Sequence, residues 1–76
     1  MQETQIILRD IDSIRDFVRK VIQVEYEVDL VQGRYVIDAK SIMGIFALDV
    51  LSPITVVAHT ANADEFFAKI EKYLVK

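Results

Sequence analysis

The stretch Asp38-Ala39-Lys40-Ser41-Ile42-Met43-Gly44 joins two different patterns. Before it, apolar residues alternate with polar ones, which is typical of a strand with one buried face. After it, a short apolar run ends at Leu51-Ser52-Pro53, because proline cannot continue a helix and disfavours helix in the residue before it. The sequence therefore predicts a helix over residues 42–49, with Ser41 in the N-cap position.

Upstream of this joint, the period of two covers two segments. Residues 24–31 alternate between apolar and mostly acidic side chains, and residues 35–39 alternate again. Gln32-Gly33 between them predicts a hairpin turn, since glycine readily takes a positive φ. The two segments are expected to pair as antiparallel strands.

The outer parts of the chain complete the order of elements. Residues 5–9 predict a first strand, residues 54–59 predict a fourth, and Asp12 or Ser13 is expected to cap a first helix of about three turns. Asn62, three residues before Glu65, resembles a capping box and opens a last helix. Three lysines lie towards the end of that helix, where they suit its dipole: Lys69, Lys72 and Lys76.

The resulting order is β-α-β-β-α-β-α. It indicates an α+β, two-layer sandwich with helices on one face of an antiparallel sheet, and a single domain over residues 1–76. Two known architectures share this order, and the periodicity does not separate them. A ferredoxin-like unit with an added helix has strand order 4-1-3-2, and the other architecture has order 1-4-2-3.

Composition excludes several classes of function. With 53% hydrophobic and 28% charged residues, the 76-residue chain is expected to fold around one core. It has no cysteine and one histidine, so no cysteine-based or multi-histidine metal site is expected. A net charge of −3 with dispersed basic residues argues against nucleic acid as a partner. No run predicts a membrane span or a signal peptide, so we expect a cytoplasmic protein without membrane contact.

The segment Ala39-Lys40-Ser41-Ile42-Met43-Gly44-Ile45 closely resembles the Lys-Ser-Ile-Met-Gly segment of HPr, in its Gram-positive form. HPr is the phosphocarrier of the bacterial sugar phosphotransferase system. The Gly33 hairpin, Phe17-Val18 and Ala63-Asp64-Glu65 extend the resemblance. It implies the HPr-like open-faced sandwich: a four-stranded antiparallel sheet of order 1-4-2-3, with three helices on one face.

The resemblance implies that Ser41 is the regulatory serine, which HPr kinase/phosphorylase phosphorylates with ATP and dephosphorylates. A phosphate at a helix N-terminus meets free N–H groups, and Lys40 is adjacent. The alternative is that Ser41 only caps the helix.

The predicted helix also offers a docking surface. If Ile45 and Leu48 face the sheet, then Ile42, Met43 and Phe46 lie on or near the outward face. By resemblance, this surface and Lys40 bind HPr kinase/phosphorylase and a transcriptional regulator. The alternative places Phe46 in the core and leaves only Met43 exposed.

The sequence departs from HPr at the phosphorylatable histidine. Phosphocarrier activity requires a Gly-x-His-x-Arg-Pro segment, and aligning Phe17-Val18 places Asp10 at the histidine and Asp12 at the arginine. No residue from 9 to 14 is histidine, and the segment reads as acidic. We do not expect Asp10 or the single His59 to replace the acceptor. No nucleophile and base pair or phosphate loop is readable, so we expect neither an enzyme nor a cofactor.

Three hypotheses remain open. The first is an HPr-like regulatory protein that acts in catabolite control through Ser41 phosphorylation and docking. The second is an interaction module in which Ser41 is only a cap and the Met43/Phe46 surface binds another partner or a second copy, giving a homodimer. The third is a ferredoxin-like ligand-binding or dimerisation domain.

Overall fold

A computed structural model describes residues 1–75. Its elements follow the expected order, with the last predicted helix divided into α3 and a short 3-10 helix: β1 (Gln2–Ile6), α1 (Ile11–Ile22), β2 (Val28–Gln32), β3 (Tyr35–Asp38), α2 (Ile42–Ile45), β4 (Ile54–Ala58), α3 (Asp64–Lys69) and η1 (Glu71–Tyr73). Lys76, expected with the other lysines of the last helix, lies outside the described residues.

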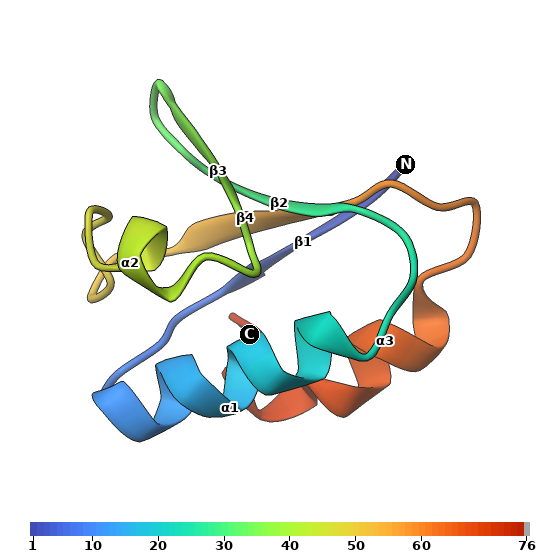
Figure 1. The fold of residues 1–76 in the computed structure, drawn as a ribbon, viewed down its shortest axis with the longest axis horizontal. Coiled ribbons are helices and arrows are strands. Elements are labelled where there is room, and N and C mark those ends of the chain that lie inside the picture. The colour runs from blue at the N-terminus through green and yellow to red at the C-terminus, as the bar shows by residue number, and fades with distance from the viewer. Residues whose placement is uncertain (76) are drawn as a thin grey trace.

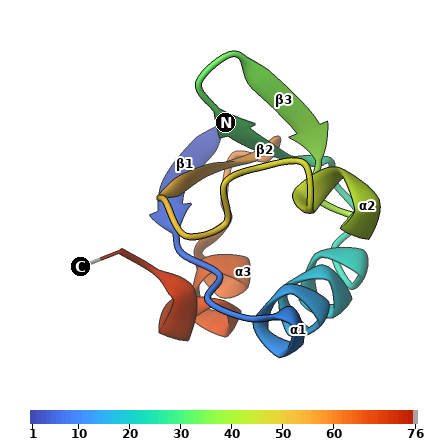
Figure 2. The same ribbon diagram turned by 90° about the vertical axis from the view of Figure 1, so that its left-hand side faces the viewer.

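The four strands form one antiparallel sheet in the order β1-β4-β2-β3. Below it, α1 and α3 lie side by side, and α2 lies on the same side near β3 (Figures 1 and 2). The structure confirms the α+β open-faced sandwich with order 1-4-2-3 and excludes the ferredoxin-like order 4-1-3-2.

The core lies between the sheet and the helices. Alternation along the strands turns Leu30 of β2 and Val56 of β4, which are opposite each other, towards the helices. Phe17 of α1 and Phe66 of α3 fill the space below and are also fully buried. Within residues 1–75, no helix lies on the other face of the sheet (Figures 1 and 2).

The hairpin between β2 and β3 confirms the predicted turn. Gln32 is opposite Tyr35, so Gly33 and Arg34 form a two-residue connection. Gly33 has a φ of +60°, the left-handed region that glycine enters without strain.

Two strand boundaries differ from the prediction. β1 covers residues 2–6 rather than 5–9, because pairing with β4 extends to Gln2 opposite Ala58. After Ile6 the chain leaves β4, and Ile7 N donates to Tyr73 O at 2.9 Å. β2 begins at Val28 rather than at residue 24, so the alternation before Val28 belongs to a connection whose apolar side chains pack against the core.

The predicted 42–49 helix is also shorter, since α2 ends at Ile45. The chain then tightens, with Leu48 N bonded to Ile45 O at 3.0 Å. Gln32 holds Asp49 from both sides: its Nε2 donates to Asp49 O at 2.8 Å, and its Oε1 accepts from Asp49 N at 2.8 Å. A side chain from β2 thus holds the loop that follows α2, within the range predicted as helix.

Two predicted N-caps were wrong. Asp10, rather than Asp12 or Ser13, caps α1. At α3 the N-cap residue is Ala63 without a side-chain bond, although Asn62 Oδ1 accepts a hydrogen bond from Asp64 N at 3.0 Å.

Candidate functional site

The turn between β3 and α2 positions Ser41. Asp38 organises this turn, because its carboxylate accepts a hydrogen bond from Lys40 N at 2.8 Å and its carbonyl accepts one from Ser41 N at 3.0 Å. Ser41 follows in an extended conformation, with φ −92° and ψ 99°, as is usual for an N-cap residue.

Ser41 caps α2 as the sequence predicts. Its Oγ accepts a hydrogen bond from Gly44 N at 3.0 Å, and the residue is exposed. Glycine suits position 44, because a Cβ there would lie 3.1 Å from Ser41 Oγ and 3.3 Å from Ile37 Cδ1. The serine oxygen is therefore held at the start of the helix and remains open to solvent.

The outward side of α2 carries an apolar patch. Met43 is 77% exposed and Phe46 is 49% exposed, whereas Ile45 and Leu48 are buried. Phe46 does not enter the core, so the exposure pattern follows the expected one. Ile42 differs from this expectation: it is half-buried and packs against the core. We call Lys40, Ser41, Met43 and Phe46 the α2 surface.

The start of α1 holds the two aspartates that align with the HPr histidine and arginine: Asp10 at the N-cap and Asp12 in the first turn. Asp10 Oδ1 accepts a hydrogen bond from Ser13 N at 2.7 Å, and the hydrogen bonds from Ser13 lower the pKa of Asp10. Asp12 is exposed in the first turn of α1, where its charge is favourable towards the helix dipole. Asp10 therefore acts as a helix cap in this position.

Basic side chains border a hollow near the start of α1. This hollow of about 250 Å³ is lined by Ile7 and Arg9 of the β1–α1 loop, Ser13 of α1, and Lys72 and Tyr73 of η1. The fold thus brings a distant lysine to a segment that reads as acidic in the sequence.

A polar cluster that the sequence did not reveal joins α1 to η1. Asp16 accepts hydrogen bonds from Lys20 Nζ at 2.8 Å and from Tyr73 OH, and Lys72 Nζ lies 3.5 Å from the same carboxylate. Bonding to Lys20 and Tyr73 lowers the pKa of Asp16 well below its usual range. Burial, followed by the bond to Asp16, raises that of Tyr73. Only the Asp16–Lys20 spacing of four residues could have been read from the sequence.

His59, the single histidine, pairs with Asp29 on the face of the sheet opposite the helices. It follows β4, and its Nε2 lies 2.7 Å from Asp29 Oδ2. This side chain therefore contributes to a surface pair far in the sequence from the Asp10 loop.

Two further properties concern the described residues 1–75. None of their helices is both long enough and apolar enough to cross a bilayer. Among the same residues, no three histidine, cysteine or carboxylate side chains come together as a metal-binding group.

Comparison with known proteins gives a structural likeness without a sequence match. The sequence matches no protein-family model and no curated protein. The structure is similar to "HPr-C-His from Thermoanaerobacter tengcongensis", with a TM-score of 0.79 and 20% sequence identity. The match covers 95% of this chain and 89% of that chain. The chain therefore has an HPr-like fold.

Proposed function

We propose that this chain is an HPr-like regulatory protein of the phosphotransferase system that carries no phosphate between enzymes. Phosphorylation of Ser41 and docking of the α2 surface give it a role in catabolite control in the bacterial cytoplasm. The observation that carries this proposal is the position of Ser41: an exposed serine oxygen caps α2 beside the exposed Met43 and Phe46.

The proposed modification transfers the γ-phosphoryl group of ATP to Ser41 Oγ, catalysed by HPr kinase/phosphorylase. The product carries a charge of about −1.5 to −2 at neutral pH next to the main-chain N–H groups of α2, and Lys40 precedes Ser41 in the chain. The α2 surface thereby gains a strong anion at the border of its apolar patch of Met43 and Phe46. A transcriptional regulator with a basic group beside an apolar pocket would distinguish the two forms.

The test is phosphorylation of the purified chain by HPr kinase with ATP, read by intact mass. We expect one phosphate on the wild type and none on Ser41→Ala. Ser52→Ala is the matched control and should still be modified, because Ser52 Oγ is bonded to Asp49 Oδ2 at 2.8 Å, outside the α2 surface. An unchanged wild-type mass, while HPr itself is phosphorylated in parallel, would contradict the proposal.

A second candidate function rests on Met43, whose side chain is 77% exposed at the centre of the α2 surface. In this version the surface binds a partner, or a second copy, without phosphorylation, and a flexible thioether beside an aromatic ring suits such contacts. Binding would then persist in Ser41→Ala and be lost in Met43→Ala. Ile22→Ala is the control, since Ile22 is also exposed, at 61%, but is the last residue of α1 and not part of the α2 surface.

A further inference from the structure

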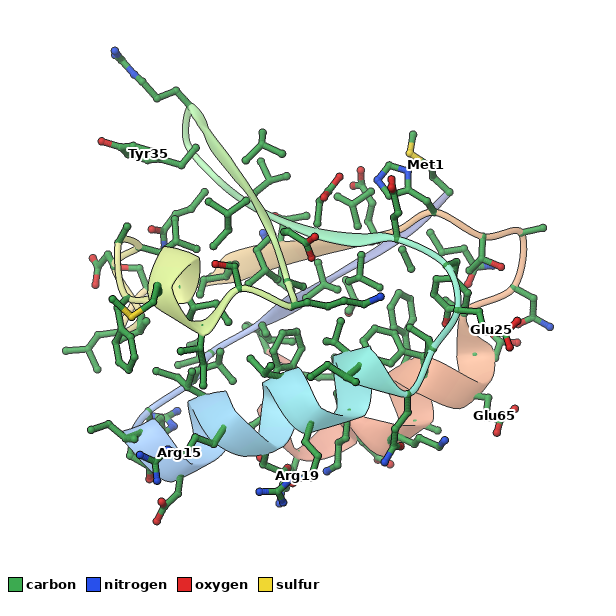
Figure 3. The ribbon with its side chains drawn as sticks, in the orientation of Figure 1. Met1, Arg15, Arg19, Glu25, Tyr35 and Glu65 are labelled. Carbon is green, nitrogen blue, oxygen red and sulfur yellow. The ribbon has the colours of Figure 1, made fainter. Side chains whose placement is uncertain are left out.

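The two edges of the sheet differ in whether another segment of the chain bonds to them. At the outer edge of β1, Ile7 N donates to Tyr73 O and Val75 N donates to Gln5 O, each at 2.9 Å, so the C-terminal segment covers part of this edge. β3 forms the other edge and, among residues 1–75, has no strand on its outer side. The β2–β3 hairpin stands out from the body, with Tyr35 projecting near its tip (Figures 1 and 3).

The hydrogen-bond pattern shows which main-chain groups of β3 face outwards. Ala39 N donates to Val28 O, and Ile37 lies opposite Leu30. Because hydrogen-bonded and non-hydrogen-bonded pairs alternate along an antiparallel ladder, Ile37 directs its main-chain groups to β2, and Val36 and Asp38 direct theirs away. Asp38 O is already occupied by Ser41 N. Val36 N–H, Val36 C=O and Asp38 N–H therefore remain at the open edge.

The side chains at this edge are exposed, and the Asp38 carboxylate accepts one hydrogen bond, from Lys40 N. Tyr35 and Val36 are 58% and 63% exposed. Arg34 and Asp38 stand at opposite ends of the strand, and within residues 1–75 neither takes part in an ion pair. Exposed edge strands are templates for pairing with another chain, and natural proteins usually protect them.

We propose that two copies of this chain associate through antiparallel pairing of β3 with β3, about a two-fold axis at Val36. In this register Val36 lies opposite the partner's Val36, and the outward N–H and C=O groups of the two residues bond to each other. Tyr35 lies opposite the partner's Ile37, an aromatic pair with a β-branched residue. Arg34 lies opposite the partner's Asp38, and the same ion pair forms twice.

Charge selects this register over its neighbour. An axis at Ile37 satisfies the same hydrogen-bond alternation, but it would place Arg34 opposite the partner's Lys40. Like charges directly opposite each other are unfavourable, whereas opposite charges stabilise a cross-strand pair. The pairing joins short strands and buries less than a standard interface, so we expect a dissociation constant on the order of 100 μM.

The first experiment measures association by sedimentation equilibrium, up to about 1 mM, ten times the expected constant. Arg34→Asp gives each copy an acidic edge, and Asp38→Lys gives each copy a basic one. Each variant alone should therefore have a dissociation constant roughly tenfold or more above that of the wild type. A mixture of the two should recover association, because the acidic edge of one faces the basic edge of the other. A mixture that associates no better than its components would overturn the proposed register.

A second pair of variants tests the main-chain contact. Val36→Pro removes an outward N–H without removing a bond to β2, a position at which edge strands tolerate proline. It should abolish association, and Val36→Thr, which keeps the N–H and the β-branched shape, should retain it. Circular dichroism checks that every variant is folded. A wild type that stays monomeric at 1 mM, or a dimer that persists unchanged in Val36→Pro, would show the proposal to be wrong.

Discussion

The helices α1 and α2 begin in the same way but are held by different means. In both, a side-chain oxygen accepts a hydrogen bond from the N–H three residues on: Asp10 from Ser13 at 2.7 Å, and Ser41 from Gly44 at 3.0 Å. α1 continues for 12 residues, whereas α2 has four and buries only Ile45. The buried side chains of α1 are Ile14, Phe17, Val18 and Val21.

This difference shows where a local change has the larger structural effect. At α1 the cap is one contact among many, because four buried side chains hold the helix against the sheet. At α2 the capping bond reaches Gly44, one residue before the helix ends at Ile45. A group added to Ser41 therefore lies close to the whole helix. A small modification can therefore alter the α2 surface without disturbing the core.

The largest expected effect concerns the one buried side chain of α2. Ile45→Ala should lower the free energy of unfolding by about 2–5 kcal/mol, because it leaves a cavity beneath α2. Met43→Ala, two positions earlier and exposed, should change it by less than about 0.5 kcal/mol. Urea denaturation of both variants measures the contrast. Equal losses would show that α2 is not anchored through Ile45.

An intermediate effect is expected in the pH dependence of stability, which distinguishes the carboxylate cap of Asp10 from the hydroxyl cap of Ser41. The hydrogen bonds from Ser13 lower the pKa of folded Asp10 below the ordinary value of 3.8, so its ionised form favours the folded state. This stability is fully present at neutral pH and is lost as the pH falls through and below 3.8. Asp10→Ser keeps a cap that does not titrate in this range.

Thermal unfolding between pH 2 and pH 7 tests this prediction. As the pH falls through this range, the Tm of the wild type should fall relative to the Tm of Asp10→Ser. Asp12→Ser is the control, because Asp12 lies in the same turn and does not cap the helix. A difference that stays constant with pH would refute the assignment of the cap to ionised Asp10.

The smallest expected effect tests whether Ser41 and Gly44 interact. Gly44→Ala should change the free energy of unfolding by no more than about 1 kcal/mol, because the gain in helix propensity offsets the crowding of Ser41 Oγ. In a Ser41→Ala background that oxygen is absent, and Gly44→Ala should become more favourable. A double-mutant cycle measures the coupling, and additive effects would indicate that the two residues do not interact.

The order of elements, the Gly33 turn and the Ser41 cap could be predicted from the sequence, because each depends on neighbouring residues. The exposure of Met43 and Phe46 follows from helical spacing in the same way. Asp10 was missed as a cap because Asp12 and Ser13 are equally suitable residue types nearby, and only the path of the chain after Ile6 selects among them.

Features that depend on distant partners could not be predicted. Gln32, 17 residues before Asp49, holds the loop after α2 by two hydrogen bonds to Asp49. The bond from Tyr73 OH to Asp16 joins residues 57 positions apart, and no local pattern indicates it. The roles of Lys40, Ser41, Met43 and Phe46 in binding remain predictions, since geometry gives their exposure and not their partner.

During synthesis on a ribosome, β1 emerges before β4, the strand with which it pairs. Its only paired strand within residues 1–75 is β4, and its outer edge receives Leu74, opposite Ile6, and Val75 from the other end of the chain. Contacts of such long sequence separation close slowly. We therefore expect the apolar side chain of Ile6, which lies opposite Ile54 and Leu74, to stay unpacked until these later segments have been translated.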